Sequence, residues 1–308
     1  MGESSGSAYC RVLSSTLGES IVASAASDTW LWLVLEYGGP WAAKAYAQAV
    51  LPAEVRQAID GWVEQFPGAR VQLIRRRDTP RDGAVHLYLG WSRPEHRVVR
   101  RFHLPGYDAV PSVDVPSFVA AARRGEHPTM GEVVERPVML VCTNGRRDRC
   151  CAKWGVPVYR ELSRRDDVDV WQTTHLGGHR FAATLLTLPD GLCYGRVEPG
   201  EVDELVRATR AGTIHRLDRF RGRTALGSAA MAAEHFFREQ TGRMQIDAVQ
   251  GVQTEPSSHG SLARVRDDAG LEHRIAVVRE TLAESAAPSC CKPPEPLTRW
   301  LRVTPEHH

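Results

Sequence analysis

Residues 137–197 decide how this chain folds, and they read PVMLVCTNGRRDRCCAKWGVPVYRELSRRDDVDVWQTTHLGGHRFAATLLTLPDGLCYGRV. Three of the seven cysteines lie close together near its start, and a pair of histidines follows: Cys142, Cys150, Cys151, His175 and His179. Thiolate sulfur and imidazole nitrogen are both common metal ligands in proteins. Two thiolates and two imidazoles in this arrangement therefore predict one metal site.

The secondary structure expected around these residues places them at one edge of a sheet. The apolar run 138–141 predicts a buried strand, which leaves Cys142 at its carboxyl end. Loops at that end of an open α/β sheet present ligands. A loop is expected from Cys142 to Cys151, a helix from about Pro157, and a second strand over 168–172.

The two histidines follow that second strand. Because they lie four residues apart, one turn of helix would place both imidazoles on the same face. Gly177-Gly178 between them would let the backbone pass close to a bulky ligand. A hairpin over 181–188 and 192–197 and a helix over 199–210 complete the unit. Strand, helix, strand, hairpin, helix is the order of a thioredoxin-like fold.

The first half of the chain repeats this order without the cysteines. We expect a strand over 29–36, a helix over 53–65 and strands near 71–75, 85–89 and 98–102. Gly38-Gly39 stands where the cysteine loop would be. The prediction is a degenerate α/β half of similar element order.

Four segments follow from these patterns. An N-terminal α/β domain spans 1–110, a proline-broken connector spans 111–136, and the thioredoxin-like metal domain spans 137–212. Residues 213–308 are expected to form a small C-terminal extension, with a helix over 224–240 and antiparallel strands around 248–253, 262–266 and 273–278.

Three motifs in this chain resemble the sucrase/ferredoxin-like family: CTNGRRDRCCA at 142–152, HLGGHRFA at 175–182 and SCCKPPEPLTRW at 289–300. The resemblance implies a domain similar to thioredoxin-like [2Fe-2S] ferredoxins. It also implies a cluster held by two cysteines and two histidines, with the second cysteine nine residues after the first. Carried onto this chain, the ligands are Cys142, Cys151, His175 and His179. Family members often have histidine where this chain has Asn144.

A [2Fe-2S] cluster with these ligands would make the protein an electron carrier and not a stand-alone enzyme. Two neutral imidazoles in place of two thiolates remove negative charge and raise the reduction potential. The expected division is two cysteines on one iron and two histidines on the other. Reduction would also draw a proton to His175 and His179, so we expect proton-coupled redox. No paired carboxylates stand in a recognisable glycosidase setting, and we expect no sucrase activity.

The residues alone leave other interpretations open. The same ligands could hold a structural zinc ion in an interaction module, because a set of two cysteines and two histidines does not by itself determine which metal binds. Cys150 or Cys151 could instead serve a thiol oxidoreductase, activated by nearby arginines. Spacing alone also allows Cys150 in place of Cys151 as the ligand. Of the distant cysteines, we expect Cys10 to be a small buried hydrophobe, and Cys290-Cys291 to supply one structural thiol.

Composition favours a globular cytoplasmic protein. The 308 residues carry 39 basic and 37 acidic side chains, a net charge of +2, so nothing indicates nucleic acid. The first residues show no secretory signal, and the longest apolar run, 30–35, is far short of the ~20 residues that span a bilayer. Seven clustered cysteines do not indicate a disulfide framework.

The partner expected is a redox protein. Arg146, Arg147 and Arg149 share the cysteine loop, where they could steer an acidic redox partner. The alternative is a solvated charged turn.

Overall fold

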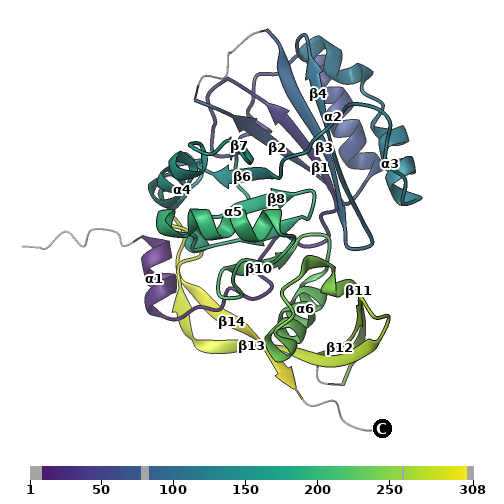
Figure 1. Cartoon of the computed structure of the whole chain (residues 1–308). Helices are drawn as coiled ribbons and strands as arrows, with labels where there is room; N and C mark the ends of the chain where they lie inside the picture. The colour runs from purple at the N-terminus through teal and green to yellow at the C-terminus, as the bar shows by residue number, and fades with distance from the viewer. Residues whose placement is uncertain (1–8, 78–82, 259, 304–308) are drawn as a thin grey trace, which may run out of the picture.

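The computed structural model describes residues 9–77, 83–258 and 260–303. The first eight residues, where we expected no secretory signal, lie outside this range. Within it the chain forms a 10-stranded mixed sheet with helices on its outer faces and a separate 4-stranded antiparallel sheet (Figure 1). In the part of the chain so described, no helix is both long and apolar enough to cross a membrane.

The second half of the large sheet, which carries the candidate ligands, has the predicted topology. Its strands are β6 (Val138–Cys142), β7 (Asp169–Thr173), β8 (Leu185–Leu188) and β9 (Leu192–Tyr194), in the order β9-β8-β6-β7. Strand β6 runs parallel to β7 and antiparallel to β8, which in turn pairs antiparallel with β9. The helices are α4 (Arg149–Leu162) and α5 (Val202–Arg210), with η2 (His179–Phe181) and η3 (Pro199–Glu201) as short 3-10 turns.

The first half repeats this arrangement. Its strands are β1 (Leu31–Glu36), β2 (Ala69–Arg75), β3 (Val85–Arg93) and β4 (His96–Leu104), in the order β2-β1-β3-β4. Strand β1 is parallel to β2 and antiparallel to β3, just as β6 is to β7 and β8. Helix α2 (Ala53–Gln65) occupies the place of α4; η1 (Tyr107–Ser112), α3 (Val115–Arg123) and β5 (Glu132–Val133) follow β4. The predicted degenerate half is confirmed in its topology.

The two halves join at the carboxyl ends of β2 and β7. Ile74 pairs with Thr173 and Arg75 with Gln172 in a short antiparallel contact. The half-sheets then pack face to face: Leu188 of β8 lies 3.5 Å from the position that a Cβ on Gly90 of β3 would take. The core between them contains Trp32, Val34, Val138, Leu140, Cys142 and Leu186. Helices α2 and α3 cover one outer face and α4 and α5 the other, so the layers run helix, sheet, sheet, helix (Figure 1).

The C-terminal extension begins with β10 (Phe220–Arg223), which adds to the edge of the large sheet at β9. Helix α6 (Ser228–Thr241) and η4 (Ile246–Ala248) follow. The small sheet is β11 (Val249–Ser257), β12 (Gly260–Asp267), β13 (Glu272–Ala286) and β14 (Glu295–Val303). Helix α6 packs on this sheet through Ala232, Ala233 and Phe237.

Several elements differ from the sequence prediction. Helix α4 begins at Arg149, eight residues before Pro157, because Asp148 caps it: one carboxylate oxygen accepts the N–H of Cys150 at 2.8 Å. The loop after Cys142 is therefore shorter than expected, and Cys150 and Cys151 lie in the first turn of the helix. The sequence also did not predict β10, β14 or a short N-terminal helix, α1 (Cys10–Thr16).

Candidate metal centre

Cys142 and Cys151 are brought together by the close packing of α4 on β6. Cys142 ends β6, and Cys151 lies in the first turn of α4, one turn before Gly155. A Cβ at Gly155 would lie 2.1 Å from the carbonyl oxygen of Cys142, so only glycine allows the helix this close to the strand. Both thiols are buried.

His175 joins these two thiols from the loop after β7. The Sγ atoms of Cys142 and Cys151 and a ring nitrogen of His175 all lie within 4.8 Å of one another. The Sγ of Cys151 is 3.9 Å from Nδ1 of His175. These three groups could hold one metal ion.

His179 lies against His175, although not by the route expected. The two rings stack with their centroids 4.2 Å apart and 19° between their planes. They do not share a helix, because Gly178 takes a left-handed conformation at φ +66° and His179 only then begins η2. The Nδ1 atom of His179 is buried and has no hydrogen-bond partner among the described residues.

Two arginines hold the histidine loop in place. Arg70 of β2 donates to the carbonyl oxygen of His175 at 3.1 Å, and Arg221 of β10 donates to that of Gly177 at 3.0 Å. A Cβ on Gly178 would lie 2.5 Å from Nη2 of Arg221. The second glycine of the pair therefore makes room for an arginine and not for a bulky ligand. Sequence reasoning missed both arginines, since nothing near them in the chain pointed to the loop.

The electrostatics of the centre favour the metal-binding form at Cys142 and at His179. Hydrogen bonds from Cys151 and His175 hold the pKa of the Cys142 thiol well below its usual value despite burial. Cys151 is the donor in the first of these bonds, and this bond together with burial raises its own pKa. Burial, with the nearby His175, lowers the pKa of His179 to about 4. A thiolate and a neutral imidazole are the forms that bind metals.

Cys150 lies in a different environment from its neighbour Cys151. Its Sγ is 3.4 Å from that of Cys10 and 3.3 Å from that of Cys290. A hydrogen bond from Cys10 lowers the pKa of Cys150 to about 7. The structure thus places Cys151, and not Cys150, beside Cys142 and His175, a choice that sequence spacing left open.

Comparison with known proteins supports the resemblance seen in the motifs. The sucrase/ferredoxin-like family matches residues 22–222, a range that covers both half-sheets and the residues of the candidate centre. This chain belongs to the sucrase/ferredoxin-like family.

Among individual relatives, the chain is similar to altered inheritance of mitochondria protein 32 from two yeasts. It is 33% identical over 96 residues to the protein from Meyerozyma guilliermondii, covering 28% of this chain and 34% of that protein. With the protein from Clavispora lusitaniae it shares 30% identity over 84 residues, covering 25% of this chain and 31% of that protein. The chain thus spans about a third of the length of these relatives.

Solved structures give a more distant likeness. A thioredoxin-like [2Fe-2S] ferredoxin from Aquifex aeolicus aligns with a TM-score of 0.23 and 21% identity, covering 26% of this chain and 84% of that chain.

The arginines of the cysteine loop do not form a single group in this family member. Arg146, Arg147 and Arg149 are all exposed. Arg149 lies over the ring of Tyr9, 4.3 Å from its centroid, and hydrogen-bonds to Cys290. Arg146 lines a cavity of about 450 Å³ together with Trp41, from the loop that follows β1. Arg149 therefore has a partner within the chain, and Arg146 and Arg147 are the better candidates for a docking role.

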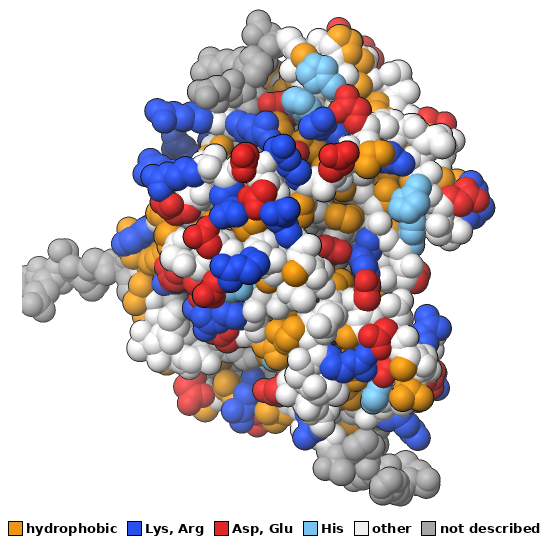
Figure 2. Space-filling model, viewed as in Figure 1, with side chains coloured by type: hydrophobic (Ala, Val, Ile, Leu, Met, Phe, Trp, Pro, Cys, Tyr) orange, Lys and Arg blue, Asp and Glu red, His pale blue; other side chains and the backbone are white. Residues whose placement is uncertain are grey.

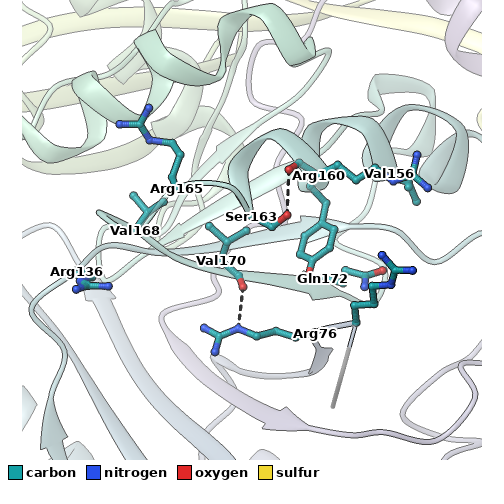
Figure 3. A pocket seen from close by; sticks show the side chains of 11 residues that line it. Arg76, Arg136, Val156, Arg160, Ser163, Arg165, Val168, Val170 and Gln172 are labelled. Carbon is teal, nitrogen blue, oxygen red and sulfur yellow. Dashed lines mark hydrogen bonds between the residues drawn. The ribbon is translucent and has the colours of Figure 1, made fainter.

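A larger basic cavity lies between α4 and β7, where no sequence pattern predicted one. Its volume is about 720 Å³, and it is lined by Arg76, Arg77, Arg136, Arg160 and Arg165 together with side chains from α4 and β7 (Figure 3). Figure 2 shows basic side chains gathered on this face, over α4. A negatively charged surface or ligand would be attracted to it.

Proposed function

We propose that this protein is an electron carrier that holds one [2Fe-2S] cluster through Cys142, Cys151, His175 and His179. The observation that carries the proposal is the buried Nδ1 of His179, which has no hydrogen-bond partner in the part of the chain that the structure describes, on a ring stacked against His175. A buried polar atom without a partner costs about 1–3 kcal/mol. A bond to iron would satisfy that atom.

The donor set fits the cluster. Two thiols, from the end of β6 and the first turn of α4, and two stacked imidazoles from the loop after β7 together equal the ligand count of a [2Fe-2S] centre. Such a cluster supplies reversible one-electron transfer when bound. Within the chain, the thiolates contribute negative charge and the neutral rings do not, which favours a higher potential than four thiolates would give.

The surroundings of the centre suit a carrier. Trp171 and Leu176 are buried beside Cys142 and Cys151 in the core between the half-sheets, which keeps water from the sulfur ligands. His175 is half-buried and is the most exposed of the four proposed ligand residues. Proton coupling would need an outer imidazole nitrogen in contact with solvent, and it stays a prediction.

The redox partner would be an acidic protein. Arg146 and Arg147 are exposed on the loop that links Cys142 to α4, so an acidic surface docked there would approach the centre closely. The compartment expected from composition is the cytoplasm.

A matched pair of cysteine variants tests the ligand assignment. Protein purified without oxygen should be brown and contain about two iron atoms per chain. Cys151→Ser should lose the iron and the visible absorption, whereas Cys150→Ser, changed at the adjacent position, should keep both. Loss of iron in Cys150→Ser with retention in Cys151→Ser would reverse the assignment. A colourless wild-type protein without iron would overturn the proposal.

One observation favours a second candidate. The ligand atoms of Cys142, Cys151 and His175 lie within 4.8 Å of one another, which is compact enough for a single ion. The same residues would then hold a structural zinc ion in an interaction module. Stoichiometric zinc, with no iron and no redox signal, would identify this case. The thiol oxidoreductase fits less well, because Cys150 and Cys151 are both buried from disulfide substrates.

A further inference from the structure

A second cluster of thiols lies beside the candidate centre. Cys10, Cys150 and Cys290 place their Sγ atoms 3.4 Å, 3.3 Å and 3.6 Å from one another in pairs. The carboxylate of Asp148 is the fourth member, with an oxygen 3.9 Å from Sγ of Cys10. All four ligand atoms lie within 4.8 Å of one another.

The cluster joins three segments that are remote in sequence. Cys10 begins α1, Cys150 lies in the first turn of α4, and Cys290 lies between β13 and β14 (Figure 1). Cys10 and Cys150 are fully buried and Asp148 is 3% exposed. Folding has therefore brought two buried thiols, the half-buried thiol of Cys290 and a buried carboxylate into one place. Such a concentration of ionisable groups is costly unless they share a ligand.

The distances fit one tetrahedral metal ion. With Zn–S bonds of about 2.3 Å, two sulfurs on the same ion lie about 3.8 Å apart, and a carboxylate oxygen lies about 3.5 Å from each sulfur. The three S···S distances, at 3.3–3.6 Å, are each within a few tenths of an ångström of that value. A disulfide would need about 2.05 Å and would leave one thiol over.

The carboxylate of Asp148, the fourth group of the cluster, is held in place by hydrogen bonds from the backbone. One oxygen of Asp148 accepts the N–H of Cys150 and the other accepts the N–H of Cys290, both at 2.8 Å. The N–H of Cys10 also points at Sγ of Cys290, 3.5 Å away. Hydrogen bonds of this kind, which fix ligands and stabilise their charge, typically surround metal sites.

We propose that Cys10, Cys150, Cys290 and Asp148 bind one structural zinc ion, distinct from the centre formed by Cys142, Cys151 and the two histidines. Zinc is chosen because thiolate sulfur and carboxylate oxygen are both ligands of zinc, and because its structural sites are closed and four-coordinate. The ion would fasten α1 and the segment before β14 to the first turn of α4. This proposal goes beyond the electron-carrier function and does not depend on it.

The position of the ion gives it an indirect effect on the neighbouring centre. Cys150 and Cys151 are consecutive residues of the same helical turn, so an ion on Cys150 fixes the backbone that carries Cys151. Losing the zinc should loosen that turn. We expect the loss to lower the thermal stability of the whole protein, since three distant segments would be released together.

Metal analysis of full-length variants tests the proposal. Wild-type protein purified without chelators should contain about one zinc per chain. Cys290→Ser should lose most of the zinc, whereas Cys291→Ser, the same change at the exposed neighbouring residue, should keep it. Cys142→Ser should lose iron and keep zinc. Because iron and zinc are measured in the same samples, the result shows separately whether the iron site or the zinc site is wrongly assigned.

Two further measurements keep the test decisive if Cys290→Ser folds poorly. Cys290→His should restore zinc, since imidazole replaces thiolate at such sites. Cobalt added to apoprotein of Cys142→Ser, in which the other centre is disabled, should give the intense absorption of thiolate–cobalt bonds, and adding Cys10→Ser to that variant should remove it. Wild-type protein that takes up neither metal would overturn the proposal. So would a disulfide between two of the three thiols in anaerobic protein, or loss of iron instead of zinc in Cys290→Ser.

Discussion

Alanine at Gly155 should separate α4 from β6 and thereby disturb the candidate centre. The added Cβ would lie 2.1 Å from the carbonyl oxygen of Cys142, about 1.3 Å closer than the 3.4 Å at which ordinary contact begins. The obstacle is backbone, so no side-chain rotation relieves it. The helix must move outward by about 1 Å, carrying Cys151, one turn away, from Cys142.

The expected change in the free energy of unfolding follows from two opposing effects. Overpacking of a tight contact costs about 1–3 kcal/mol, and replacing glycine by alanine within a helix returns about 1 kcal/mol. The net loss is up to about 2 kcal/mol. Divided by an unfolding entropy of about 2.1 cal/mol/K per residue, it lowers the melting temperature by up to about 3 °C for a chain of 308 residues. Iron content should fall as well.

Gly61 provides the matched control. It lies in α2, the helix that corresponds to α4 in the first half, and a Cβ there would meet nothing within 4 Å. Gly61→Ala should raise the melting temperature by about 1–2 °C, because only the helix-propensity gain applies. Thermal unfolding by circular dichroism, with an iron count on each variant, measures both effects. If Gly155→Ala melts at or above the wild-type temperature with full iron, the packing argument is refuted.

Two further predictions concern charge. Glu234→Gln should destabilise the protein by about 3–5 kcal/mol in chemical denaturation, because a fully buried carboxylate oxygen accepts from Arg223 at 2.9 Å and Arg238 at 2.8 Å. Burial alone would raise the pKa of Glu234, but these two arginines hold it below its usual value. The ion pairs therefore stabilise the folded protein fully above pH ~4.3, and this stabilisation is lost as the pH falls through the lower pKa of the folded state. The deficit of the variant should shrink in acid, and a constant deficit would argue against the ion pairs. The second prediction concerns the redox partner. The rate of electron transfer from the wild-type protein to an acidic protein should fall as the salt concentration rises, and this dependence should disappear in the double variant Arg146→Ala/Arg147→Ala. A wild-type rate that does not change with salt would mean that these arginines form only a solvated turn.

The order of elements could be predicted because it depends on local patterns. The apolar run 138–141 became β6, and the amphipathic stretch 53–65 became α2 with the expected bounds. Errors arose where a nearby polar group or glycine overrode the pattern. Pro157 suggested a helix start, but Asp148 caps α4 earlier, and left-handed Gly178 prevents the helix that the histidine spacing favoured.

The candidate site was only partly predictable for a different reason. Cys142, Cys151 and the histidines lie within one short stretch, so their motif spacing pointed to a common centre. Cys10 and Cys290 lie 140 residues either side of Cys150, and no periodicity links them. We expected Cys10 to be a buried hydrophobe, yet its sulfur meets two other thiols. Only tertiary packing of α1 and the C-terminal extension reveals that cluster.

The repeated topology explains why the candidate centre needs the half that has no cysteines. Because β2 and β7 meet at their carboxyl ends, the loops that follow β1 and β6 lie at the same junction. Asn144 of the cysteine loop donates to the carbonyl oxygen of Ala42 at 3.0 Å, and Arg70 of β2 donates to that of His175. The first half thus supplies hydrogen bonds to both ligand-bearing loops of the second. A half-sheet without ligands of its own still holds those loops in position, and its separation from the second half would leave Asn144 and the histidine loop without these partners.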